Sequence, residues 1–252
     1  MNRFPHQGAS HYLYLVGNTL LSVLTWTAWS AGRRHYLVTH TTQQVYFTAL
    51  QSFKLAFFIG LALGLLVVLP FSSLGFTDLH MLTMLMQKVL FHQLVPFITA
   101  IVVIGRSGTS ITAEIASMQS QQAIEGLLIV GVDPHQLLVL PRVLGVTISM
   151  LLLAVWMMAG AIFGSGVLVV LVDGVSLSQV WRASAAPITV VELFMAALMM
   201  VWFGISIATI HCYYGFLSRN AVETSRNLPR AFVRSFLTCL LVIVLFSWVR
   251  YG

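Results

Sequence analysis

The sequence predicts an all-α membrane protein that crosses the bilayer several times. Of 252 residues, 58% are apolar and only 8% are charged, and the mean hydropathy is +0.91, whereas a soluble domain carries charge on about a quarter of its residues. A hydrocarbon core of about 30 Å needs about 20 helical residues, so the chain has room for about five or six spans and little else. No alternating segments of about ten residues indicate a β-barrel.

Charge-free intervals locate the expected spans. A charge at the middle of the bilayer costs a few kcal/mol, so spans are expected to run between charged residues. Five such intervals are 55–77, 89–105, 143–172, the apolar stretch after Glu192 and the stretch after Arg234. Each is expected to be a helix, because lipid offers the backbone no hydrogen-bond partner.

The segment 12–29 has a different pattern. Asn18, Ser22 and Thr25 recur at helical spacing and form a polar stripe on an otherwise apolar helix. This stripe predicts an interfacial helix, with a sixth span as the alternative, since the stripe lacks the basic residues typical of a surface helix. Residues 1–46 are therefore interpreted as an interfacial helix with a cytoplasmic segment, and residues 47–252 as the transmembrane domain.

Basic residues in the short loops predict the orientation. With a cytoplasmic N-terminus, nine of them lie inside, namely Arg3, Arg33, Arg34, Arg106, Arg142, Arg219, Arg226, Arg230 and Arg234. Only Lys88, Arg182 and Arg250 then lie outside. The net charge of +6 is scattered along the chain, which argues against a nucleic-acid partner and favours loops that face anionic lipid.

Few residues are available for metal binding or disulfide chemistry. Cys212 and Cys239 both fall in apolar stretches, so they are expected to be packing residues that form neither a disulfide nor a metal site. No cofactor is expected to bind this chain.

The stretch 106–142 is much longer than a turn between helices requires. Thr109 or Ser110 is expected to cap a helix, and Ile111, Ile115 and Met118 fall on one face of it. The pattern predicts a short pair of helices lying across the cytoplasmic surface. Such a pair is either a solvated loop or a coupling element that docks on an ATPase.

A second helical piece is expected to end at the run Gly131-Val132-Asp133-Pro134. Pro134 cannot continue a helix, and Asp133 is expected to cap the helix that follows.

This stretch resembles the central signature of the MlaE (YrbE-like) permease family, the membrane subunits of ABC systems that work with MCE proteins. The segment GRSGTSITAEIASM, the later Asp-Pro and the Pro-Arg pair carry the resemblance. The matching positions are Gly105, Arg106, Gly108, Ala113, Glu114, Met118, Gly131, Asp133, Pro134, Pro141 and Arg142.

The resemblance implies a homodimeric permease of the bacterial inner membrane that moves lipid, with phospholipid as the expected cargo. It also implies partners: cytoplasmic ABC ATPases, a periplasmic MCE protein and a small STAS-type subunit. The sequence has no phosphate-binding loop, since neither of its two lysines follows a glycine, so ATP and Mg are expected on the partner ATPase. The expected coupling residues are Arg106, Glu114, Met118, Glu125, Gly131, Asp133, Pro134 and Arg142.

A polar pair lies within the second expected span. His92 and Gln93 precede Pro96, where family members usually carry an Arg-Glu pair. Polar residues inside a membrane are functional candidates, so the pair is predicted to line a lipid cavity, with hydrogen bonding between helices as the alternative. The GxxxG spacings at Gly60 and Gly160 allow close helix packing. The first spacing lies on the first span, which the resemblance to the MlaE family implies is near the dimer axis and the lipid cavity, so Leu61, Leu65 and Leu66 are expected to form the apolar wall of this cavity.

Two other functions fit parts of the sequence. Ser107 in a G-x-S-G segment, with His211 in a later span, fits a rhomboid-type intramembrane serine protease. The polar segment after Ser107 argues against it. A proton-coupled secondary transporter would use His92 and Gln93, but no carboxylate is expected beside them.

Overall fold

The computed structural model of the protein describes residues 17, 31–73, 90, 92–173 and 190–251. Helices account for nearly all of these residues and no strand occurs among them, which confirms the all-α class. The α-helices are α2 (Ala31–Val45), α3 (Phe53–Ser73), α5 (Val95–Val103), α6 (Thr109–Ser120), α7 (Ala123–Ile129), α8 (Leu140–Asp173), α10 (Val190–Leu217) and α11 (Ala221–Tyr251). Three π-helical segments are η2 (Tyr46–Leu50), η4 (Ile104–Gly108) and η5 (His135–Val139).

Five helical stretches in the described part are long and apolar enough to cross a membrane, which confirms the expected number of spans. They are Arg34–Val67, His92–Ser120, His135–Leu171, Val190–Leu217 and Ala221–Arg250. The first begins about twenty residues earlier than expected, because α2 runs through η2 toward α3 with only a short turn between them. The expected interfacial helix at 12–29 lies outside the described residues apart from Gly17, as do Arg3, Lys88 and Arg182.

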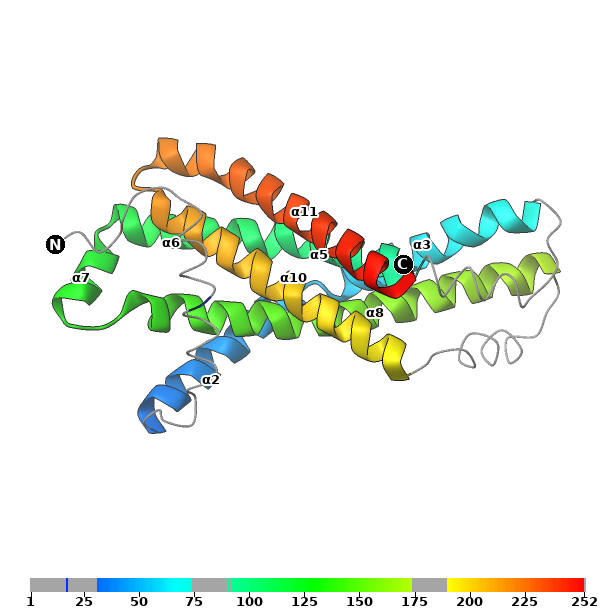
Figure 1. The fold of residues 1–252 in the computed structure, drawn as a ribbon, viewed down its shortest axis with the longest axis horizontal. Helices are drawn as coiled ribbons and strands as arrows, with labels where there is room; N and C mark the ends of the chain where they lie inside the picture. Colours follow the sequence, from blue (N-terminus) through cyan, green and yellow to red (C-terminus); the bar gives the residue numbers. More distant parts are fainter. Residues whose placement is uncertain (1–16, 18–30, 74–89, 91, 174–189, 252) are drawn as a thin grey trace.

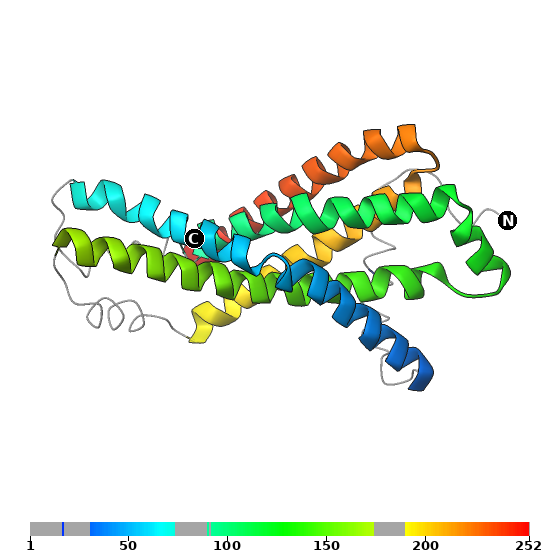
Figure 2. The same ribbon diagram turned by 180° about the vertical axis from the view of Figure 1, so that it is seen from behind.

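The helices form an elongated bundle (Figure 1). Helices α3 and α8 lie side by side and extend together at one end, whereas α6, α10 and α11 gather toward the other. Helix α7 lies at the tip of that second end, and α2 diverges from the bundle (Figure 2). The turn between α10 and α11 is at the same end as α7.

The two GxxxG motifs pack against each other within the chain. A Cβ atom at Gly60 or Gly64 would overlap the backbone of α8 at Met157 and Ala161. In return, Gly160 and Gly164 lie against the carbonyl groups of Phe57 and Leu61 on α3. The close approach that both motifs permit is therefore used between α3 and α8.

The expected helix over 109–120 is present, but its predicted cap and orientation are wrong. Gly108 already has right-handed helical angles, and the Thr109 hydroxyl donates a 2.6 Å hydrogen bond to the carbonyl of Gly105 one turn back. Helix α6 thus continues the line of α5 through η4 and does not lie across the surface (Figure 2). The expected apolar face is confirmed, since Ile111 and Ile115 are buried.

The turn after α6 follows the sequence prediction more closely. Gln122, at a φ of 58°, separates α6 from α7, and Gly131, at a φ of 80°, follows the end of α7. A carboxylate oxygen of Asp133 accepts a 3.0 Å hydrogen bond from the backbone N–H of His135, which confirms the predicted cap. Two short helices were expected to lie across the cytoplasmic surface, and only α7 lies across the end of the bundle.

Candidate functional site

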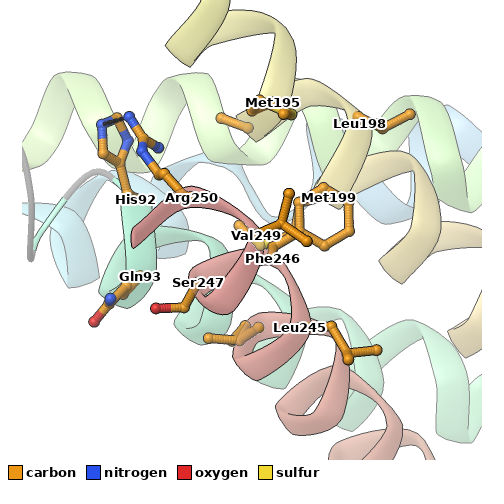
Figure 3. A pocket seen from close by; sticks show the side chains of 12 residues that line it. His92, Gln93, Met195, Leu198, Met199, Leu245, Phe246, Ser247, Val249 and Arg250 are labelled. Atoms are coloured by element: carbon orange, nitrogen blue, oxygen red, sulfur yellow. Dashed lines mark hydrogen bonds between the residues drawn. The ribbon is translucent and has the colours of Figure 1, made fainter. Parts of the chain in front are cut away.

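A pocket of about 260 Å³ lies among the start of the second span, α10 and α11 (Figure 3). Four of its lining side chains are polar: His92, Gln93, Ser247 and Arg250. The remaining walls are apolar and come from Met195, Ala196, Leu198, Met199, Ile243, Leu245, Phe246 and Val249. The labelled polar groups lie on one side and Leu198, Met199 and Leu245 on the other, so the pocket has a polar side and an apolar side.

The polar side is organised around Arg250. One guanidinium nitrogen, Nη2, donates to Oε1 of Glu192 at 2.7 Å and to Nε2 of His92 at 2.8 Å. The same carboxylate oxygen lies 3.6 Å from His92 Nε2. Glu192 is in the first turn of α10 and Arg250 in the last turn of α11, where the helix dipoles favour an acid and a base respectively. Three helices thus meet at one charged cluster.

The cluster corrects one premise of the secondary-transporter alternative. The sequence placed no carboxylate near His92, yet Glu192 lies beside it. Glu192 and Arg250 are 100 and 158 residues further along the chain than His92 and appeared to be charges that flank two spans. Their opposite charges at the ends of successive spans were the signal in the sequence that could have paired them.

The predicted lipid-cavity residues do not form one site. Only His92 and Gln93 line the pocket. Pro96 is buried in the first turn of α5. Leu61, Leu65 and Leu66 lie on α3, which packs chiefly against α8, and none of them lines this pocket.

The predicted coupling residues also divide into two groups, and three of them make contacts within the bundle. Arg106 donates to Ser52 Oγ and, at 2.9 Å, to Oε1 of Gln51 in the short turn before α3. Glu114 forms a 2.9 Å ion pair with Arg142, which is buried and also donates to the carbonyl of Leu138. These contacts join η4 to the turn before α3, and α6 to α8.

The other predicted coupling residues lie nearer the tip of the hairpin. Glu125, Gly131 and Asp133 are exposed, Pro134 is buried, and Met118 is partly buried against the core.

Exposed apolar residues at the end of α7 were not predicted as site residues. Ile129 is 87% exposed and Val130 is 79% exposed, and Leu128 and Val132 are also exposed. The apolar run LLIVGV inside an otherwise polar stretch was the signal that could have identified them. A contiguous apolar tip on a short surface helix is typical of a protein contact site.

His211 is a packing residue at the crossing of α6 and α10. Its Nδ1 lies 2.8 Å from the Thr112 hydroxyl, which also approaches the His211 carbonyl oxygen at 3.1 Å. Its Nε2 faces Gly108, where a Cβ atom would lie 2.5 Å away. Within the described chain, Ser107 makes no hydrogen bond to His211, so the pair needed for a rhomboid-type protease is not formed.

Comparison with known proteins gives the family. The family described as Permease MlaE matches residues 40–249 of this chain. The intermembrane phospholipid transport system permease protein MlaE of Haemophilus influenzae is 28% identical over 191 residues, which cover 74% of this chain and 70% of that protein.

Two further relatives extend the comparison. A probable ABC transporter permease of Rickettsia prowazekii is 31% identical over 73% of this chain and 71% of its own length. The chloroplastic protein TRIGALACTOSYLDIACYLGLYCEROL 1 of Arabidopsis thaliana is 27% identical over 63% of this chain, but the match spans only 45% of that protein. Since the family match covers all five candidate spans apart from their outermost residues, the chain belongs to the MlaE permease family.

Proposed function

We propose that this chain is the membrane-spanning permease subunit of an ABC-type transporter that moves phospholipid across the bacterial cell envelope. The observation that carries the proposal is the family match over residues 40–249, joined with relatives whose names describe phospholipid transport and ABC permeases. The chain acts as a homodimer in the inner membrane, with separate cytoplasmic ATPases, a periplasmic MCE protein and a small STAS-type subunit. It performs no chemistry itself.

The hairpin formed by α6, α7 and α8 is the proposed coupling element. The exposed apolar end of α7, together with Glu125, offers a surface for an ATPase. Helix α6 is continuous with α5 through η4, and the Glu114–Arg142 ion pair joins α6 to α8. A displacement of α7 is therefore passed to two spans as a rigid-body movement.

The pocket beside His92 and Gln93 is the proposed lipid site. A phospholipid has a polar headgroup and apolar chains, and the pocket has a polar side and an apolar side to match. Charged groups are costly at membrane depth and are kept where they line a pathway or contact a substrate.

ATPase measurements test the proposal. The purified chain is expected to hydrolyse no ATP, because it has no phosphate-binding loop. Co-expression with an ABC ATPase subunit is expected to yield a complex that hydrolyses ATP and transfers fluorescent phospholipid between vesicles. Hydrolysis by the chain alone, or a complex that hydrolyses ATP without transferring lipid, would contradict the proposed function.

A further inference from the structure

The first span contains a joint at residues 51 and 52, between η2 and α3. The backbone N–H of Gln51 donates at 3.3 Å to the carbonyl of Tyr46, five residues earlier. The N–H of Ser52 donates at 3.1 Å to the carbonyl of Ala49, only three residues earlier, and regular helical bonding resumes in α3. Such local changes of helical register are typical of functional hinges. On the far side of this joint, α2 diverges from the bundle (Figure 2).

Helix α2 is held against the bundle by a small contact. Among the α2 side chains that the structure describes, only Leu37 is buried. It packs in a small cluster with Leu140 and Leu144 of α8, apart from the main core. Gln44 also packs closely on Gly145 of α8. A pocket of about 350 Å³ lies between α2 and the turn after α7, lined by Tyr36, Leu37, Gly131, Val132, Asp133, Gln136 and Leu137. A helix with so few buried apolar contacts and with space beside it can shift at low cost.

Arg106 contacts the joint from the second span. Its guanidinium donates to Oγ of Ser52 and, at 2.9 Å, to Oε1 of Gln51. Ser52 is buried and Gln51 is exposed, so the two contacts hold the joint from the inside and from the surface. A planar guanidinium that binds through two nitrogens fixes the orientation of its partners as well as their distance. Arg106 lies in η4, which leads directly into α6 of the hairpin.

We propose that Arg106 is a positioning residue that makes α2 follow the movement of the hairpin. The inference rests on the proposed function, because the movement is the one that an ATPase imposes on α7. A displacement of η4 moves the guanidinium, the guanidinium moves the turn at residues 51 and 52, and α2 pivots there and shifts on α8. Three spans thereby respond to one displacement of α7, instead of the two that flank the hairpin.

The ratio of phospholipid transferred to ATP hydrolysed tests this role in the complex co-expressed with an ABC ATPase. Arg106→Met keeps a long side chain and removes every donor. We expect the ratio to fall by about tenfold, the factor that corresponds to one hydrogen bond from a charged group, while ATP hydrolysis continues. Arg106→Lys should restore part of the ratio, because lysine keeps the charge but not the planar fork. A residue that only supports the fold would lower assembly and hydrolysis together.

A second measurement follows α2 itself. Leu37→Cys places a thiol in the buried contact with α8, and the native residues Cys212 and Cys239 are both buried. The rate of maleimide labelling at position 37 should rise at least about fivefold when the complex hydrolyses ATP, the lower end of the range for coupled equilibria. In the Arg106→Met background, the rate should be the same with and without ATP.

Gln51→Ala provides a test that does not depend on the folding of Arg106→Met. Gln51 is exposed, so its truncation should leave assembly intact, and the ratio of lipid to ATP should fall by about threefold because one of the two contacts is lost. The double variant should be no worse than Arg106→Met alone, since both changes remove the same contact. Gln43→Ala is the matched control, at an exposed position of α2, and should leave the ratio unchanged.

The outcomes separate this inference from the proposed function. An unchanged ratio in Arg106→Met, additive losses in the double variant, or labelling of position 37 that does not respond to ATP in the otherwise wild-type complex overturns the role of Arg106. If Arg106→Met does not assemble, an unchanged ratio in Gln51→Ala overturns it. Failure of the wild-type complex to transfer any lipid contradicts the proposed function, and the response of position 37 to ATP then still decides whether α2 moves.

Discussion

At the scale of single residues, Gly108 shows how closely the hairpin packs against α10. The imidazole of His211 lies fully buried beside it, and a methyl group at position 108 would approach the ring within 2.5–2.9 Å. The ring is also held from its other side by the Thr112 hydroxyl. The small residue at position 108 thus keeps α6 and α10 in register.

Gly108→Ala is therefore expected to destabilise the protein by about 1–3 kcal/mol, as overpacking of a dense core does. Gly105→Ala is the matched control from the same π-helical segment, because its added methyl group would meet only Phe232, at an ordinary 3.8 Å. Thermal unfolding of the two purified variants measures the difference. An equal midpoint for both variants would show that the contact with His211 is easily relaxed.

Prediction of single residues from the sequence succeeded where the chemistry is local. Asp133 caps the segment after Pro134 because its side chain reaches a backbone N–H two residues away. Thr109 does not cap α6, because the preceding span continues into this helix. The local sequence pattern around Thr109 does not show where that span ends. The Glu192–Arg250 pair joins residues 58 positions apart at the far ends of two successive spans, so no local spacing indicates it.

At the scale of elements, the sequence predicted the number of spans but not how the hairpin joins them. Charge-free intervals define the apolar cores because burial of charge in lipid is costly. The extent of a helix also depends on polar residues that continue it beyond the bilayer, as α6 does after η4. The polar stretch was therefore interpreted as a surface pair, although only α7 lies across the end of the bundle.

The exposed tip of α7 leads to a prediction for this element. Ile129→Asp is expected to abolish binding of the ATPase subunit, because it places a charge on the exposed apolar end of α7, the proposed contact surface. The fold should persist, since the side chain is 87% exposed. Co-purification of the tagged permease with the ATPase measures the loss.

The control for this prediction is Val222→Asp, which introduces the same charge at an exposed residue near the start of α11, at the same end of the bundle. It should retain the ATPase. Equal losses in both variants would indicate a general effect of negative charge at this end, and normal co-purification of Ile129→Asp would exclude α7 as the contact.

At the scale of the whole molecule, the basic residues that the structure describes are unevenly distributed between the two ends of the bundle. The end that carries α7 also carries the turn between α10 and α11, which contains Arg219, and the first half of α11, which contains Arg226, Arg230 and Arg234. At the opposite end of α11, the basic residue Arg250 is paired with Glu192. An excess of basic residues in and near the loops marks the cytoplasmic side of a membrane protein, so the α7 end is expected inside the cell.

Thiol labelling tests this orientation because both native cysteines, Cys212 and Cys239, are buried. Val130→Cys places a thiol on the exposed end of α7, and Val190→Cys places one at the exposed start of α10, at the opposite end of the bundle. In sealed vesicles with the cytoplasmic face outward, a membrane-impermeant maleimide should label position 130 and leave position 190 unlabelled until detergent is added. In right-side-out vesicles the pattern should reverse, because the five spans fix the two ends on opposite faces. Labelling of position 190 alone in the first preparation would place the α7 end outside. An ATPase in the cytoplasm would then have no access to α7, so this result would contradict the coupling mechanism as well as the orientation.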